Sequence, residues 1–182
     1  MTRASKPASG SAGKATAKAS LRAALVAELE AALASARAAH AAAIEGATHA
    51  EARPENDKDT RGLEQSYLAR GIAGRVAELE AAVATASAMA LRTFGDDDAI
   101  ALGALVDVEE AGRTRRFWLA AHGGGLVLPG EVTVLTPTSP IGRALLGKHV
   151  DDECEVGGAL EAESAGPDDR QRHRLLTITA IA

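Results

Sequence analysis

Four acidic side chains fall within nine residues in the first third of the chain: Glu51, Glu55, Asp57 and Asp59. Carboxylate oxygens are the ligands that a hard cation such as Mg²⁺ requires, so two or three of them could complete the coordination of a metal held mainly elsewhere. The same composition also fits an ordinary solvated loop whose acids cap the helix that follows. From composition alone both interpretations stay open.

Heptad patterns on both sides of this acidic segment predict a helical hairpin. Large apolar residues lie at one end of the first pattern and alanines at the other, so the end next to the acids is expected to be less stable. The spacings alternate between four and three in Leu25, Leu29, Ala32, Ala36, Ala39 and Ala43, and again in Ile72, Val76, Leu79, Val83 and Ala86. Arms of about 30 residues would be roughly 40–45 Å long. The hairpin is predicted to span residues 20–92, with its tip near residues 51–59.

After residue 97 the pattern changes to the period of two that is typical of β-strands. Strands are predicted over residues 100–108, 115–121, 132–135, 153–156 and 174–181. Cys154 alternates with two glutamates, so its side chain is expected to point inward and to be inert. Phe117 and Trp118 are adjacent, which predicts one aromatic ring on each face of the sheet and core packing for one of them. Residues 97–182 therefore form a small β-rich domain, and the chain belongs to the α+β class.

A capped helix of two turns is predicted between these strands, in residues 139–148. Ser139 is a good N-cap, and Pro140 suits the first helical position because its missing N–H costs nothing there. Ile141 lies on the apolar face, and Gly147 offers a left-handed stop. Such a short helix requires packing against the rest of a domain.

The sequence of this stretch resembles the C-terminal domain of the bacterial Gre transcript-cleavage factors. The matching residues are SPIGRALLGK, preceded by VTVLTP and followed by HVDDE. Glu64-Gln65, Arg75 and Glu78-Leu79-Glu80 extend the match into the second arm. The resemblance implies an N-terminal coiled-coil hairpin and an FKBP-like C-terminal domain. It also implies docking on RNA polymerase at or near Ser139, Pro140, Ile141, Arg143 and Lys148.

The resemblance also implies a role for the acidic tip. In the Gre family the hairpin enters the secondary channel of RNA polymerase, and its tip acids help to hold the second Mg²⁺ of the polymerase, which then hydrolyses the 3′ end of backtracked RNA. Glu55 and Asn56 match the family's Glu-Asn, whereas the family's Asp falls on Ala52 and an acid stands one residue earlier. The resemblance thus assigns the catalytic acids to Glu51 and Glu55.

The same resemblance assigns the Mg²⁺ ligands to Glu51 and Glu55, with Asp57 and Asp59 in support. That Mg²⁺ would be shared with the polymerase and not bound by the chain alone, so the chain would be an accessory factor and not an enzyme. Its partners would be RNA polymerase and, through it, the 3′ end of the nascent RNA. A non-cleaving regulator that occupies or blocks the channel stays open because of Ala52. A coiled-coil adaptor unrelated to polymerase is the alternative from another class.

Composition limits the remaining possibilities. The net charge of −5 argues against a protein that coats duplex DNA by itself, and the lone cysteine excludes an internal disulfide. Residues 1–19 carry Arg3, Lys6, Lys14 and Lys18 without any acid, and they are expected to be a disordered tail with at most a weak attraction to nucleic acid. No apolar run approaches the length of a membrane span. The chain is expected to be a soluble, cytoplasmic monomer that does not bind a membrane.

Overall fold

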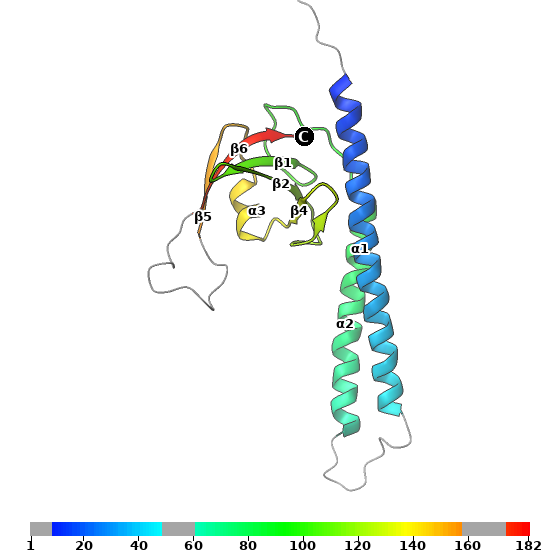
Figure 1. Ribbon diagram of the computed structural model, residues 1–182. Helices are drawn as coiled ribbons and strands as arrows, with labels where there is room; N and C mark the ends of the chain where they lie inside the picture. The colour runs from blue at the N-terminus through cyan, green and yellow to red at the C-terminus, as the bar shows by residue number, and fades with distance from the viewer. Residues whose placement is uncertain (1–8, 49–60, 158–173) are drawn as a thin grey trace, which may run out of the picture. The chain divides into compact units, whose positions relative to one another are not determined.

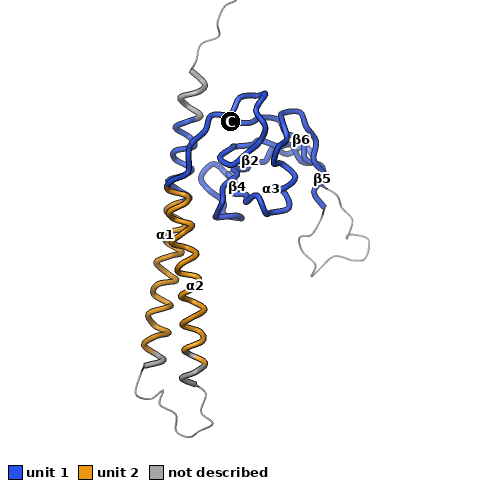
Figure 2. Tube along the Cα trace, turned by 180° about the vertical axis from the view of Figure 1, so that it is seen from behind, with its two compact units in different colours: residues 1–25, 88–182 blue, residues 26–87 orange. Residues whose placement is uncertain are grey.

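The computed structural model describes residues 9–48, 61–157 and 174–182. In chain order two long helices come first, and a sheet domain that contains one short helix follows (Figure 1). The chain divides into two compact units, Met1–Leu25 with Ala88–Ala182 and Val26–Ser87 (Figure 2). The predicted α+β class, a helical hairpin followed by a β-domain, is confirmed, and the FKBP-like character of that domain stays a prediction.

The hairpin consists of α1 (Ser9–Thr48) and α2 (Arg61–Ala88), which lie side by side (Figure 1). On α2 all five predicted seam residues are buried or half-buried, as expected. On α1 the seam differs from the prediction, because Ala32 and Ala39 are exposed while Leu33 and His40 take inward positions. The buried leucines are spaced by four, at positions 21, 25, 29 and 33. Leucine buries more apolar area than alanine, so it decides which face of the helix turns inward.

The prediction of a disordered tail over residues 1–19 is wrong from Ser9 onward, because α1 begins there. Residues 1–8 lie outside the described part. Alanine and lysine are strong helix formers, so this stretch continues the helical pattern toward the N-terminus. Lys18, assigned to a solvated basic tail, is only 2% exposed. Its burial shows that this part of α1 packs against other residues.

A six-stranded sheet forms the second half of the chain, in the order β3-β4-β2-β1-β6-β5. The strands are β1 (Leu105–Glu110), β2 (Arg113–Leu119), β3 (Val127–Leu128), β4 (Val132–Leu135), β5 (Glu153–Val156) and β6 (Arg174–Ile181). β2 pairs with β4 in parallel, and the other neighbours are antiparallel. The strands predicted at 132–135, 153–156 and 174–181 are confirmed, and β3 was missed. The predicted strand at 100–108 begins only at Leu105, because a turn occupies residues 101–104, where the Ala104 amide donates to the Ala101 carbonyl.

The main core lies on one face of this sheet, beneath helix α3 (Pro140–Leu145) (Figure 1). Phe117 belongs to this core, and Cys154 is buried in it as predicted. The expectation for the aromatic pair was only half right, because Trp118 on the opposite face is also fully buried. There it pairs in register with Val134 and donates a hydrogen bond to the Gly103 carbonyl at 3.4 Å. The sheet is therefore covered on both faces around β2 and β4.

Candidate functional site

The short helix α3 has the caps that the sequence predicts. The Ser139 hydroxyl accepts a hydrogen bond from the Gly142 amide at 3.1 Å and donates to the Thr136 carbonyl at 2.8 Å. Pro140 occupies the first helical position. After the helix, Gly147 has a φ of +78°, the left-handed conformation that glycine tolerates. The motif that resembles the Gre family is therefore a rigid corner of the domain.

The five residues assigned to docking have different roles in this corner. Ser139 uses its hydroxyl in the cap, and Ile141 packs against the main core. Lys148 is half-buried, and its backbone carbonyl accepts from the Ile100 amide at 2.8 Å. Arg143 is exposed, and the described residues include no ion-pair partner for it. Of the five, Arg143 is thus the exposed charged side chain, and Lys148 is a half-buried one.

The predicted metal-binding acids, Glu51, Glu55, Asp57 and Asp59, lie outside the described residues. The structure places the two helix ends that lead to them, Thr48 of α1 and Arg61 of α2. Sequence reasoning did not single out an apolar pair on α2 in the first turns after this segment. Tyr67 is 60% exposed and Leu68 is 58% exposed. The Arg70 guanidinium lies 5.8 Å from the centre of the Tyr67 ring.

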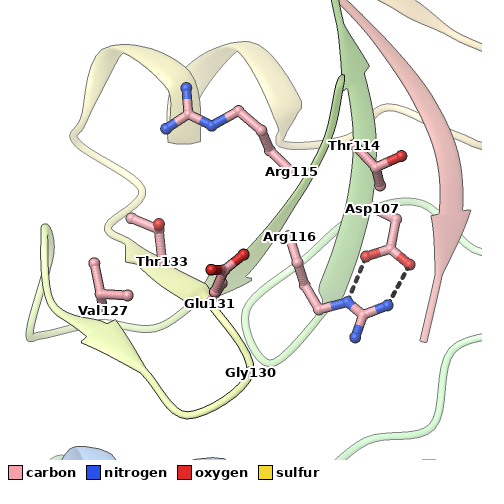
Figure 3. Close-up of a pocket in the computed structure, with 8 residues that line it drawn as sticks. All are labelled: Asp107, Thr114, Arg115, Arg116, Val127, Gly130, Glu131 and Thr133. Atoms are coloured by element: carbon pink, nitrogen blue, oxygen red, sulfur yellow. Dashed lines mark hydrogen bonds and ion pairs between the residues drawn. The ribbon is translucent and has the colours of Figure 1, made fainter. Parts of the chain in front are cut away.

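A surface hollow of about 450 Å³ lies where β2 extends beyond the start of β4 (Figure 3). Its lining comes from β1, β2, β3, β4 and the β3–β4 turn, namely Asp107, Thr114, Arg115, Arg116, Val127, Gly130, Glu131 and Thr133. Arg116 donates two hydrogen bonds to the Asp107 carboxylate, at 2.6 and 2.9 Å. This pairing raises the pKa of Arg116, against the opposing effect of burial. The lining has as many basic as acidic side chains, so the hollow has no net charge with which to attract an ion. The signal that could have located it is the basic run 113–116.

The most perturbed carboxyl group lies at the end of β1. Glu110 accepts hydrogen bonds from Arg174, one of them at 2.8 Å, and another from Arg115 at 3.0 Å. The hydrogen bonds from Arg174 and, to a smaller extent, from Arg115 together lower the pKa of Glu110 to about 2, although burial opposes the shift. Burial also raises the pKa of the Cys154 thiol, which agrees with the inert character expected of it. Both groups are thus structural parts of the β-domain.

No cluster of three or more metal-ligating side chains occurs in residues 9–48, 61–157 and 174–182. Within the same ranges no helix has the length and apolar character needed to cross a membrane.

Solved structures with a similar arrangement were found among the Gre-type proteins. GreA factor homolog 1 (Gfh1) of Thermus thermophilus is 20% identical with a TM-score of 0.35, covering 86% of this chain and 94% of its own. GreA/GreB of Nitrosomonas europaea is 17% identical with a TM-score of 0.33, covering 66% and 92%. No family model matches the chain.

Two relatives are similar in sequence. The chain is 35% identical over 105 residues to transcription elongation factor GreA of Syntrophus aciditrophicus, a match that covers 56% of this chain and 60% of the relative, less than two thirds of its length. It is 30% identical over 121 residues to transcription elongation factor GreA of Methylococcus capsulatus, covering 63% of this chain and 75% of that protein. Because the second match extends over three quarters of the relative, the chain belongs to the Gre family of transcription elongation factors.

Proposed function

We propose that this chain binds RNA polymerase, inserts its hairpin into the secondary channel and stimulates Mg²⁺-dependent cleavage of backtracked RNA. The observation that carries the proposal is a hairpin whose two arms lead to the acidic segment, in a chain of the Gre family. With 28 residues, α2 is about 42 Å long. An arm of that length can carry a few carboxylates about 40 Å from its own other end.

The chemistry proposed for the tip is the donation of oxygen ligands. Glu51 and Glu55, with support from Asp57 and Asp59, would complete the coordination of a Mg²⁺ ion that the polymerase holds. A metal pair can activate the attacking water and stabilise the leaving oxygen of the RNA. The chain would then act as a monomeric accessory factor, because the hydrolytic site belongs to the polymerase.

Two described surfaces suit the contacts that this role requires. Arg143 on α3 is an exposed cation next to the capped corner, and it would pair with an acidic group on the polymerase. Tyr67 and Leu68 expose apolar area on the second arm and would contact the channel wall. Exposed large apolar side chains are typical of surfaces that become buried in a complex.

A transcript-cleavage assay on a stalled, backtracked elongation complex tests the proposal. The wild-type protein should shorten the RNA, and Glu55→Ala should reduce the rate by at least about tenfold because a metal ligand is lost. Lys58→Ala is the matched control, since it changes the same segment without removing an acid. Equal rates for Glu55→Ala and the wild type would refute the role of this acid.

Ala52 favours a second candidate function, a Gre-family regulator that occupies the channel without promoting cleavage. If this candidate is correct, the wild-type protein should compete with an active cleavage factor for polymerase and leave the RNA intact. Ala52→Asp, which restores the acid at the family position, should then introduce cleavage. A wild-type protein that already cleaves at a rate unaffected by Ala52→Asp would exclude this alternative.

Capture of polymerase tests the partner that both candidates share. A tagged chain should recover polymerase subunits from a bacterial lysate, and Arg143→Glu should recover less because the charge is reversed at the proposed docking surface. If no polymerase is recovered by the wild type, both candidates fail, and the coiled-coil adaptor considered from the sequence becomes the better hypothesis.

A further inference from the structure

Lys18 is the only buried charged residue among the described core positions, with 2% of its surface exposed. Lysine is almost never fully buried unless its amine has partners, because removing the charge from water is costly. Here the amine donates to the Arg92 carbonyl at 2.7 Å and lies 4.6 Å from the centre of the Phe94 ring. Lys18 therefore joins the beginning of α1 to a segment 74 residues further along the chain.

A second cation, one turn later on α1, contacts the same segment. Arg22 donates from Nη1 to the Met89 carbonyl at 3.0 Å. α2 ends at Ala88, so the Met89 carbonyl follows the helix directly and the Arg92 carbonyl lies three residues later. A cation near a helix C-terminus interacts favourably with the helix dipole, which applies to Arg22 at Met89. The two cations of α1 thus hold the chain that leaves α2 at two successive points.

The contacts continue into the β-domain. Phe94 belongs to the main core, and the Arg92 guanidinium also lies 4.8 Å from its ring. Gly123, in a turn with a φ of +81°, lies so close to α1 that a Cβ atom there would be 2.5 Å from a methyl group of the buried Leu25. The first turns of α1 are therefore held both by polar contacts to residues 89–92 and by direct packing on the β-domain.

We propose that Lys18 and Arg22 form a clamp that fixes the start of α1 to residues 89–94 and to the β-domain, and that Lys18 is its positioning residue. α1 is one continuous helix from Ser9 to Thr48, so the clamp acts on the same helix that forms the first arm of the hairpin. The functional consequence rests on the role proposed above: a tip acid that is displaced by about 1 Å loses much of its effect on a reaction.

The clamp predicts a result that differs from that of a purely stabilising residue. Lys18→Met keeps most of the apolar volume but leaves the Arg92 carbonyl without its Lys18 donor, and an unsatisfied acceptor costs about 1–3 kcal/mol. Lys18→Met should therefore lower the melting temperature only modestly. It should also loosen the attachment of α1, because Met has no charge over the Phe94 ring.

The attachment can be measured in the protein alone by the distance between two spin labels within unit 1. Labels at Ala23→Cys on α1 and Glu109→Cys on β1, both exposed positions, are introduced into a Cys154→Ala background. The wild-type clamp should give one narrow distance distribution, and Lys18→Met should at least double its width. Arg113→Met, which removes an exposed cation from β2, is the matched control and should leave the width unchanged.

A distribution as narrow in Lys18→Met as in the wild type would overturn the proposal, and so would equal broadening in the Arg113→Met control. If Lys18→Met does not fold, the same measurement is made on Arg22→Met. A broader distance distribution in Arg22→Met supports the clamp, and an unchanged distribution refutes it. In the cleavage assay Lys18→Met should lower the rate by about tenfold or more with little change in competition for polymerase. The two proposals can fail separately. If Lys18→Met broadens the distance distribution but the wild-type protein neither binds polymerase nor promotes RNA cleavage, the proposed function is refuted and the clamp is still supported.

Discussion

Loss of the Glu110 charge is expected to destabilise the β-domain in a way that depends on pH. The carboxylate joins the end of β1 to Arg174, the first residue of β6, and its side chain is only 17% exposed. Arg115 on β2 adds a second ion pair at 3.0 Å. Glu110→Gln keeps the shape and one hydrogen-bond acceptor but removes the charged partner that both guanidinium groups have in the described structure.

The magnitude follows from the lowered pKa of Glu110. A fall from an ordinary value of 4.5 to about 2 corresponds to about 3.4 kcal/mol of stabilisation of the folded state at neutral pH. Solvent screens the exposed parts of both arginines, so we expect about 1.5–3 kcal/mol. Because the folded-state pKa is depressed, this contribution is present above pH 4.5 and is lost as the pH falls toward 2. About 1.1–1.4 kcal/mol of it should be lost between pH 7 and pH 3.5.

Urea unfolding of the wild type and Glu110→Gln at a series of pH values measures this contribution. The variant should be less stable by about 1.5–3 kcal/mol at pH 7, and the difference should shrink by about 1.1–1.4 kcal/mol at pH 3.5. The protonation of all other carboxylates affects both proteins equally and cancels in the difference. Glu131→Gln, on an exposed residue without an ion pair in the described structure, is the control. A difference between Glu110→Gln and the wild type that stays constant from pH 7 to 3.5 would refute the reasoning.

Three further substitutions test the local packing by urea unfolding. Gly142→Ala should cost at least about 3 kcal/mol, because the new Cβ would lie 2.0 Å from the Thr136 carbonyl oxygen, and a loss below 1 kcal/mol would contradict this close approach. Ser139→Ala should cost about 1 kcal/mol through loss of the N-cap, and an unchanged stability would show that the cap is dispensable. Gly71→Ala on α2, where no atom lies within 4 Å, should stabilise the hairpin by up to about 1 kcal/mol, and a loss of stability there would reveal a contact that the structure lacks.

Features set by neighbouring residues could be predicted from the sequence. Ser139 and Pro140 determine the start of α3 within one turn, and alternation places Cys154 inward without knowledge of its partners. β3 escaped prediction because Val127 and Leu128 make a strand of only two residues, which has no period to detect. The same limit explains residues 100–104, whose apolar character fits a strand although the chain turns there.

Features set by contacts between distant residues could not be predicted. The residues near Lys18 in the sequence do not predict its burial, because the Arg92 carbonyl and the Phe94 ring that it contacts lie more than 70 residues away. The sequence predicted core packing for only one of Phe117 and Trp118, and the burial of both depends on residues distant in the sequence, such as Val134 of β4 beside Trp118. The same difference applies to the candidate site. The α3 corner is set by neighbouring residues and its caps were predicted, whereas the hollow beside β2 is formed by several strands and was not predicted.

The two ends of the hairpin differ in how much apolar area they bury. Leu21, Leu25, Leu29 and Leu33 are buried in the part of α1 that continues from the clamp, whereas the inward positions toward Thr48 are mostly small or polar and only half-buried. Each leucine layer stabilises the pairing more than an alanine layer, so the stability of the hairpin is concentrated near its base. Lys18 and Arg22 act at this same end. The base of the hairpin is thus the end at which leucine packing and the contacts of Lys18 and Arg22 coincide.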